Sequence, residues 1–266
     1  MSATEPLLEV NGLTLRFGNG RGLHGVDLTA PRNSITGFIG VNGAGKSTTL
    51  RCILGLLRPE AGSVRLFGRA ADPAARRRLG FLPEERGLFA GDRARDVIAF
   101  NARLRGIPKN EAYRRADSLL DRIGLGGRER EPIGSLSKGN AQRVQLLCAL
   151  GHSPDMLILD EPLSGLDPMA QNEVLALFAE FRSGGGSILF STHTMAAAES
   201  VCDRVVILSN GRTAFEGPVA EAARQAPYGA VVVTDDEAGL RQAVAAVRGE
   251  VRPLSDPGAR FGSAAR

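Results

Sequence analysis

The sequence predicts an α/β fold with a parallel core sheet, an antiparallel β edge, an all-helical insert and a small C-terminal βα appendage. Four short apolar runs, at residues 35–39, 79–83, 156–159 and 187–190, indicate strands of a buried sheet. From Asp92 onward the apolar residues change to a helical spacing. A chain of 266 residues, 43% of them apolar, fits one main domain with an appendage.

The antiparallel edge is expected at the N-terminus. Residues 7–10 and 13–17 are interpreted as two strands separated by the turn residues Asn11-Gly12, and residues 26–28 continue the pattern. A further strand is expected at residues 62–67.

The all-helical insert is expected to span about residues 92–150, with two helices before the polar loop at residues 136–140. The apolar face of the first helix contains Val97, Phe100 and Leu104. The apolar face of the second contains Tyr113, Ala116, Leu119, Leu120 and Ile123, and Gly124 ends that helix.

The main domain is expected to cover residues 5–226 and to end after a hairpin formed by residues 205–208 and 212–215. Residues 227–252 predict an accessory βα segment, because a β-rich run precedes a capping box and an amphipathic helix. Residues 253–266 are expected to be disordered.

Charge and cysteine usage restrict the possible classes of protein. The net charge is a modest +4, and the densest basic run, residues 76–78, either faces an anionic partner or lipid surface or forms a solvated helix face. Cys52, Cys148 and Cys202 lack metal-ligand spacing, so we expect buried thiols in a reducing compartment. No apolar run approaches the ~20 residues that span a bilayer, which predicts a soluble intracellular protein.

Residues 40–48, Gly-Val-Asn-Gly-Ala-Gly-Lys-Ser-Thr, match the phosphate-binding pattern G-x-x-x-x-G-K-[ST]. They lie between an expected strand and an expected helix, so backbone N–H groups and the helix N-terminus can bind phosphate. Lys46 is expected at the β- and γ-phosphates and the Ser47 hydroxyl at Mg²⁺. The alternative is a simple Gly-rich turn. The pattern predicts a P-loop NTPase with nucleotide contacts from Gly40, Asn42, Gly43, Ala44, Gly45, Lys46, Ser47 and Thr48.

Two carboxylates follow the most apolar of the expected strands. Asp160 is placed to hold Mg²⁺ and Glu161 to face the terminal phosphate, because ligands of parallel α/β sheets bind at the carboxyl ends of the strands. The alternative is that the pair caps a helix. His193 follows another strand at the same edge, although a single histidine there is more often structural.

Two further features suit nucleotide binding. Phe17 ends a strand before a Gly-rich turn, so its ring either stacks on a purine or packs in the core. The loop at residues 136–140 precedes a helix, which repeats the anion-binding geometry of the P-loop.

Together these residues resemble the ATP-binding cassette of ABC transporters over about residues 7–217. In this resemblance, residues 40–48 are the Walker A loop, 156–161 the Walker B strand, 136–140 the signature motif and 164–167 the D-loop. The resemblance implies catalytic roles for Lys46, Glu161 and His193, adenine stacking on Phe17, and nucleotide contacts from Ser137, Gly139, Asn140 and Asp167.

Two positions depart from the common family pattern. The signature reads Ser137-Lys138-Gly139-Asn140, and Glu84 replaces the Q-loop glutamine. A carboxylate is a stronger hard-oxygen ligand than an amide, so Glu84 is expected to contact Mg²⁺ directly or through one water. Residues 83–88 and the signature residues 137–140 resemble the corresponding motifs in the sodium-extrusion and multidrug-type exporter branch of the family.

The resemblance implies an ATP-hydrolysing transporter subunit that requires ATP and Mg²⁺. Two such cassettes would meet head to tail, and each would contact a membrane permease at the inner face of the cell membrane through the helical insert. A cassette ATPase acting on DNA or ribosomes is the main alternative. Chromosome and repair ATPases of this class need long coiled coils or zinc modules, whereas residues 47–136 leave room only for a small subdomain. Translation-type proteins usually have two cassettes per chain. A simple P-loop kinase would lack the signature loop and His193.

Overall fold

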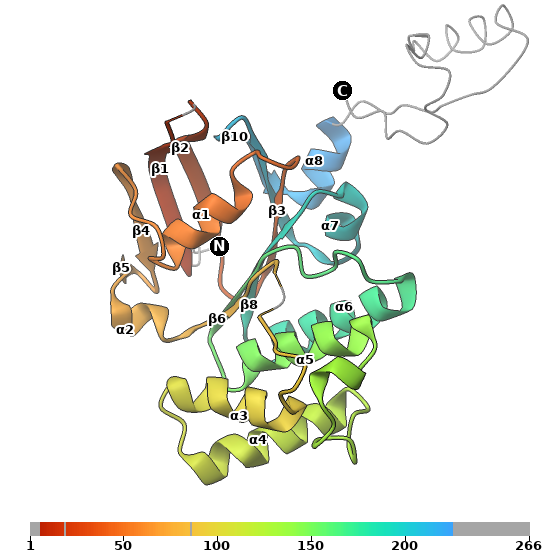
Figure 1. The fold of residues 1–266 in the computed structure, drawn as a ribbon. Coiled ribbons are helices and arrows are strands. Elements are labelled where there is room, and N and C mark those ends of the chain that lie inside the picture. The colour runs from red at the N-terminus through yellow and green to blue at the C-terminus, as the bar shows by residue number, and fades with distance from the viewer. Residues whose placement is uncertain (1–5, 19, 86, 226–266) are drawn as a thin grey trace, which may run out of the picture. The chain divides into compact units, whose positions relative to one another are not determined.

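A six-stranded sheet with the order β10-β9-β3-β8-β7-β6 forms the centre of the described chain (Figure 1). Neighbouring strands from β9 to β6 are parallel, and β10 pairs antiparallel with β9. This confirms the predicted parallel core. The strands are β3 (Ile35–Ile39), β6 (Leu79–Leu82), β7 (Met156–Leu159), β8 (Ser187–Thr192), β9 (Arg204–Ser209) and β10 (Arg212–Pro218).

The computed structural model describes residues 6–18, 20–85 and 87–225. Residues 1–222 form one unit and residues 223–266 a second, of which only 223–225 are described. The expected accessory segment at 227–252 and the expected disordered tail at 253–266 lie outside the described residues.

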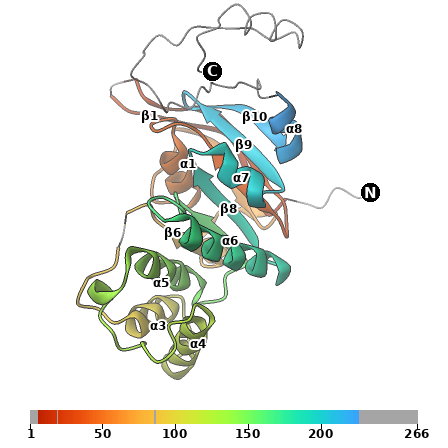
Figure 2. The same cartoon turned by 90° about the vertical axis from the view of Figure 1, so that its right-hand side faces the viewer.

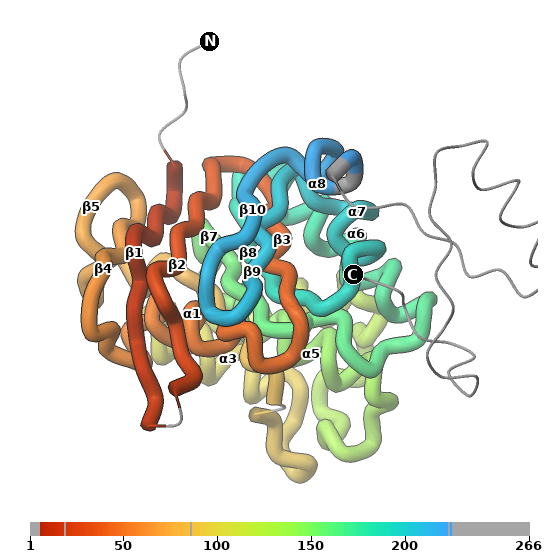
Figure 3. The backbone as a smooth tube through the Cα atoms, turned by 90° about the horizontal axis from the view of Figure 1, so that it is seen from above, coloured from red at the N-terminus to blue at the C-terminus, as the bar shows by residue number. Residues whose placement is uncertain are grey.

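A second, antiparallel sheet has the order β2-β1-β4-β5, with β1 (Leu8–Arg16), β2 (Gly22–Ala30), β4 (Ala61–Leu66) and β5 (Arg69–Ala70). The expectation of two strands before residue 17 was wrong, because β1 continues through Asn11-Gly12. The register shifts there, and Gly12 has φ +61°, so the turn signal marks a β-bulge. In Figure 3, β2 lies beside β10, and the Asp27 N–H donates to Thr213 Oγ1 at 3.1 Å.

Apolar clusters cover both faces of the central sheet. On one face, α1 (Lys46–Ile53) packs between the two sheets through Leu50 and Ile53. On the other face, α6 (Pro168–Ser183) and α7 (Met195–Val201) pack through Val174, Phe178 and Ala198. The β7 run is fully buried, as a strand covered on both faces requires.

The helical insert contains α3 (Ala94–Leu104), α4 (Lys109–Arg122), η1 (Ile133–Ser135) and α5 (Lys138–Leu150), grouped at one end of the sheet in Figure 2. The apolar face expected for the first helix was wrong, because Phe100 and Leu104 are 57% and 67% exposed. Small residues instead allow α3 to pack closely against α4 and α5. The buried positions of α3 are Ala94, Ile98, Ala99 and Ala102.

The arginine run at residues 76–78 makes structural contacts. Arg76, at the end of α2 (Pro73–Arg76), donates from Nε to the carbonyl of Ile53 at 3.1 Å. Arg78 lies over the Phe67 ring and donates to Asp155 at 2.8 Å, which lowers the pKa of that carboxyl. These contacts favour a structural interpretation for two of the three arginines.

The described chain ends with α8 (Val219–Gln225) after the predicted β9–β10 hairpin. Within the described ranges, no helix is long and apolar enough to cross a membrane.

We expect the thiols to be unreactive in the folded protein. All three are free, and burial raises the pKa of Cys148 and Cys202 to about 12 and also raises that of Cys52. At pH 8 a disulfide reagent should therefore modify none of the thiols within minutes, and all three in urea. Rapid modification of the folded protein would contradict the raised pKa values.

Candidate functional site

The P-loop connects β3 to α1, and its glycines occupy positions that other residues would strain. Gly45 caps α1 with φ +110°, and an added Cβ would lie 2.7 Å from Leu23 Cδ2. A Cβ at Gly40 would lie 2.7 Å from the carbonyl oxygen of Leu208. Both ends of the loop are therefore packed, Gly45 against β2 and Gly40 against β9, while residues 41–43 are exposed.

Lys46 begins α1 and directs its ammonium group toward the carboxyl edge of the sheet. The side chain is 6% exposed, and Nζ donates to the Gly40 carbonyl at 2.7 Å. Nζ also lies 3.2 Å from Glu161 Oε1, and Glu161 is 8% exposed. A buried ion pair thus joins the P-loop to the end of β7.

Glu161 is held in an uncommon backbone conformation, with φ +48°. Its N–H donates to Ser191 Oγ at 2.9 Å, and Oε2 lies 3.0 Å from Nδ1 of His193. Oε1 lies within ion-pair distance of Lys46 but makes no hydrogen bond among the described residues. Lys46, Glu161 and His193 therefore form one continuous polar chain. Asp160 and Glu161 do not cap a helix, because the next described helix, α6, begins at Pro168.

Asp160 is fixed by β8, the strand beside β7. It is 4% exposed, and its Oδ1 accepts from Ser191 Oγ at 2.6 Å. Ser191 thus contacts both carboxylate residues. In the sequence, Ser191 is marked only as a small polar residue at the end of the neighbouring apolar strand, which did not predict this role.

A cavity of about 260 Å³ lies beside the P-loop. It brings Glu84, from the loop after β6, to the same space as Lys46, Ser47 and Glu161. Glu85 is exposed and does not line it. The lining residues are Asn42, Gly43, Gly45, Lys46, Ser47, Thr48, Glu84 and Glu161.

The other predicted site residues do not line this cavity. Phe17 is 44% exposed at the end of β1. Ser137 caps α5 and accepts from the N–H of Asn140 at 3.2 Å, while Asp167 caps α6 and accepts from Ala170 at 2.9 Å. The remaining members of this group are Gly40, Ala44, Gly139, Asn140, Asp160 and His193.

The donor chemistry at the cavity fits Mg²⁺. Ser47 and Glu84 offer a hydroxyl and a carboxylate at the lining, whereas Asp160 does not line the cavity and accepts a hydrogen bond from Ser191. No group of three or more His, Cys, Asp or Glu side chains in the described part of the chain is arranged to hold a metal alone. Mg²⁺ usually keeps several waters and binds substrate phosphates as well as protein oxygens.

Comparison with known proteins agrees with this geometry. The profile of the family described as "ABC transporter" matches residues 23–164. The ABC transporter ATP-binding protein YhaQ of Bacillus subtilis is 37% identical over 231 residues, covering 87% of this chain and 78% of YhaQ. The methionine import ATP-binding protein MetN of Mesorhizobium japonicum is 37% identical over 225 residues, covering 82% of this chain and 62% of MetN.

Solved structures give the same result. A structure described as an ATP binding subunit of an ABC transporter is 36% identical, with a TM-score of 0.74, and the match covers 82% of this chain and 92% of that one. The structure of cbiO1 from Clostridium perfringens, described as part of the transporter complex cbiONQ, is 29% identical with a TM-score of 0.74, and that match covers 83% and 91%. Nothing in these comparisons supports the DNA or ribosome alternative. The chain belongs to the ATP-binding subunits of ABC transporters, a family that hydrolyses ATP.

Proposed function

We propose that this chain hydrolyses Mg²⁺–ATP at the P-loop cavity and powers transport through a separate membrane permease at the inner face of the cell membrane. The polar chain Lys46–Glu161–His193 carries this proposal. We expect export, because Glu84 and the signature residues 137–140 resemble the exporter branch. Since MetN is named for import, transport in vesicles of both orientations is the measurement of direction.

The proposed chemistry begins with Lys46. A terminal phosphate offers Lys46 a doubly charged partner, so the ammonium group would turn from Glu161 toward the phosphate. The Glu161 carboxylate would then accept a proton from, or orient, the attacking water. His193 would hold Glu161 through Nδ1 and present its other ring nitrogen to the phosphate.

Three oxygen donors would hold Mg²⁺, namely Ser47, Glu84 and Asp160, the last through water. When bound, the cation neutralises charge on the phosphate oxygens. Glu84 is expected to strengthen cation binding relative to an amide.

A head-to-tail pair of subunits would complete the site. Ser137 and Asp167 are exposed and do not line the cavity of their own subunit, so we propose that Ser137, Gly139, Asn140 and Asp167 contact ATP bound by a second copy. Val41 in the P-loop and Met169 beside Asp167 are 72% and 75% exposed. Apolar side chains at both places support a face that another subunit covers.

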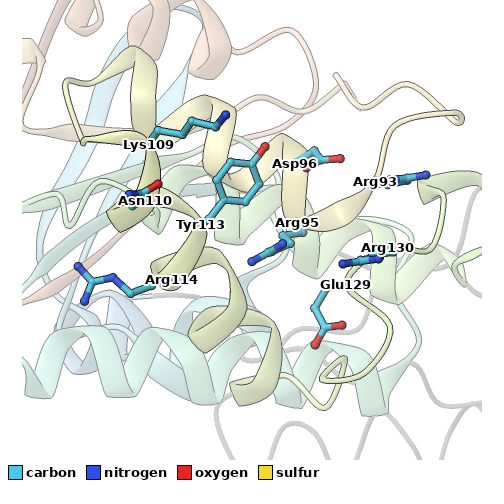
Figure 4. Close-up of a pocket in the computed structure, with 9 residues that line it drawn as sticks. All are labelled: Arg93, Arg95, Asp96, Lys109, Asn110, Tyr113, Arg114, Glu129 and Arg130. Atoms are coloured by element: carbon cyan, nitrogen blue, oxygen red, sulfur yellow. The ribbon is translucent and has the colours of Figure 1, made fainter.

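The permease contact is proposed on the helical insert. A hollow of about 560 Å³ is lined by residues of α3, α4 and the loop before η1. Figure 4 shows these lining side chains. Arg95 is paired with Asp117 and lies over Tyr113, whereas Arg93, Lys109 and Arg130 have no ion pair among the described residues. Cationic residues outnumber the acidic residues of the lining, so the occupant is an acidic cytoplasmic segment of the permease.

Replacing Glu161 with Gln should stop turnover but keep ATP binding. The amide cannot accept the proton, and general-base catalysis contributes about 10²- to 10⁴-fold. The measurements are kcat for hydrolysis and the Kd for ATP. Glu199→Gln, an exposed carboxylate on α7, is the matched control and should behave as wild type. Hydrolysis by Glu161→Gln at the wild-type rate would exclude Glu161 as the base.

The head-to-tail arrangement predicts ATP-dependent dimerisation. Glu161→Gln with Mg²⁺–ATP should elute as a dimer in size-exclusion chromatography, and a further Ser137→Arg change should restore the monomer by placing bulk and charge in the interface. Ser118→Arg, on the exposed side of α4, should not. A monomer in every condition would argue against the paired site.

Reversing charge in the hollow should weaken permease binding. Lys109→Glu with Arg130→Glu should reduce the permease that co-purifies at low salt, since like charges would then face each other, without changing ATP affinity. Arg58→Glu, outside the hollow, is the control. Equal recovery of permease with all variants would place its contact elsewhere.

A further inference from the structure

Two buried glutamines lie one turn apart on α5. Gln142 is 5% exposed and donates from Nε2 to the Pro162 carbonyl at 3.3 Å. Gln145 is 4% exposed and donates from Nε2 to the carbonyls of Pro83 and Glu85 at 3.4 and 3.1 Å. The helix that carries the signature motif is therefore bonded to the loops that follow β6 and β7.

Both loops carry site carboxylates. The two carbonyls bound by Gln145 flank Glu84, which lines the P-loop cavity. The carbonyl bound by Gln142 follows Glu161 directly. Since β6 and β7 are neighbours in the sheet, one face of α5 reaches both loops.

The Gln145 amide is a poor choice for stability alone. Its Oε1 is buried and has no hydrogen-bond partner among the described residues. An unsatisfied buried acceptor is unfavourable, and an apolar side chain of the same shape would avoid that penalty. We therefore explain the amide by the hydrogen bonds that its N–H groups donate to the loop after β6.

We propose that Gln145 is a positioning residue that fixes Glu84 at the P-loop cavity and links it to the signature helix. The link to Mg²⁺ rests on the proposed function of Glu84. Ser137 caps the same helix, so a displacement of α5 by a bound second subunit would move the Glu84 loop as well. The contact of Ser137 with ATP in the second subunit is thereby coupled to cation binding by Glu84 in its own subunit.

The test uses Gln145→Met, which keeps side-chain length and removes both donors. One readout is hydrogen exchange of the peptide that contains Glu84 and Glu85. The other is the Mg²⁺ concentration needed for half-maximal binding of a fluorescent ATP analogue, which requires no hydrolysis. Cys148→Ser, one turn further along α5 and without a hydrogen bond to either loop, is the matched control for weakened helix packing.

We expect Gln145→Met to speed exchange of the loop and to raise the Mg²⁺ requirement by about three- to tenfold, the range that corresponds to losing one or two hydrogen bonds. Cys148→Ser should change neither readout. In a Glu84→Gln background, Gln145→Met should still speed exchange but should not raise the Mg²⁺ requirement further.

Unchanged exchange in Gln145→Met, or equal changes with Cys148→Ser, would overturn the positioning role. Faster exchange with no Mg²⁺ effect in either Gln145→Met or Glu84→Gln would support the positioning role of Gln145 and refute the proposed cation contact of Glu84. The two ideas therefore fail separately.

Discussion

The buried ion pair between Lys46 and Glu161 is the contact on which the site depends. Desolvating two charges is unfavourable unless they are closely paired and hydrogen-bonded, so each group needs the other and its own neighbours. The Gly40 carbonyl supplies a second acceptor for Lys46, and His193 a partner for the other Glu161 oxygen. Losing either charge would leave its partner buried with only that one remaining hydrogen-bond partner.

Strand order makes this pair possible. Lys46 follows β3 and Glu161 follows β7, and β8 lies between those strands in the sheet. Ser191 and His193 come from the end of β8, so they stand between the P-loop and the two carboxylates. Parallel pairing places all these strand ends at one edge, where ligands of α/β sheets bind.

The helical insert is tied to this edge by polar contacts as well as by packing. Gln142 and Gln145 reach the loops after β7 and β6, while Arg143 on the same helix binds Asn140 and lies 2.9 Å from Glu173 on α6. The signature loop, the carboxylate loops and α6 therefore share one supporting helix. A force on the insert would reach the phosphate site through defined bonds rather than through the core alone.

The sequence by itself determined the features that depend on neighbouring residues. Local backbone geometry requires the glycines, the lysine and the hydroxyl of the P-loop at fixed positions, so the sequence alone identified them. Contiguous apolar runs such as residues 156–159 identified the buried strands. Only the tertiary structure decided which distant groups meet. It placed Ser191 between two carboxylates, bonded Gln145 to the loop that carries Glu84, and left Phe100 on the surface although its spacing suited a core. The physical reason is that these contacts depend on strand order and helix packing, which join residues far apart in the chain and leave no local pattern.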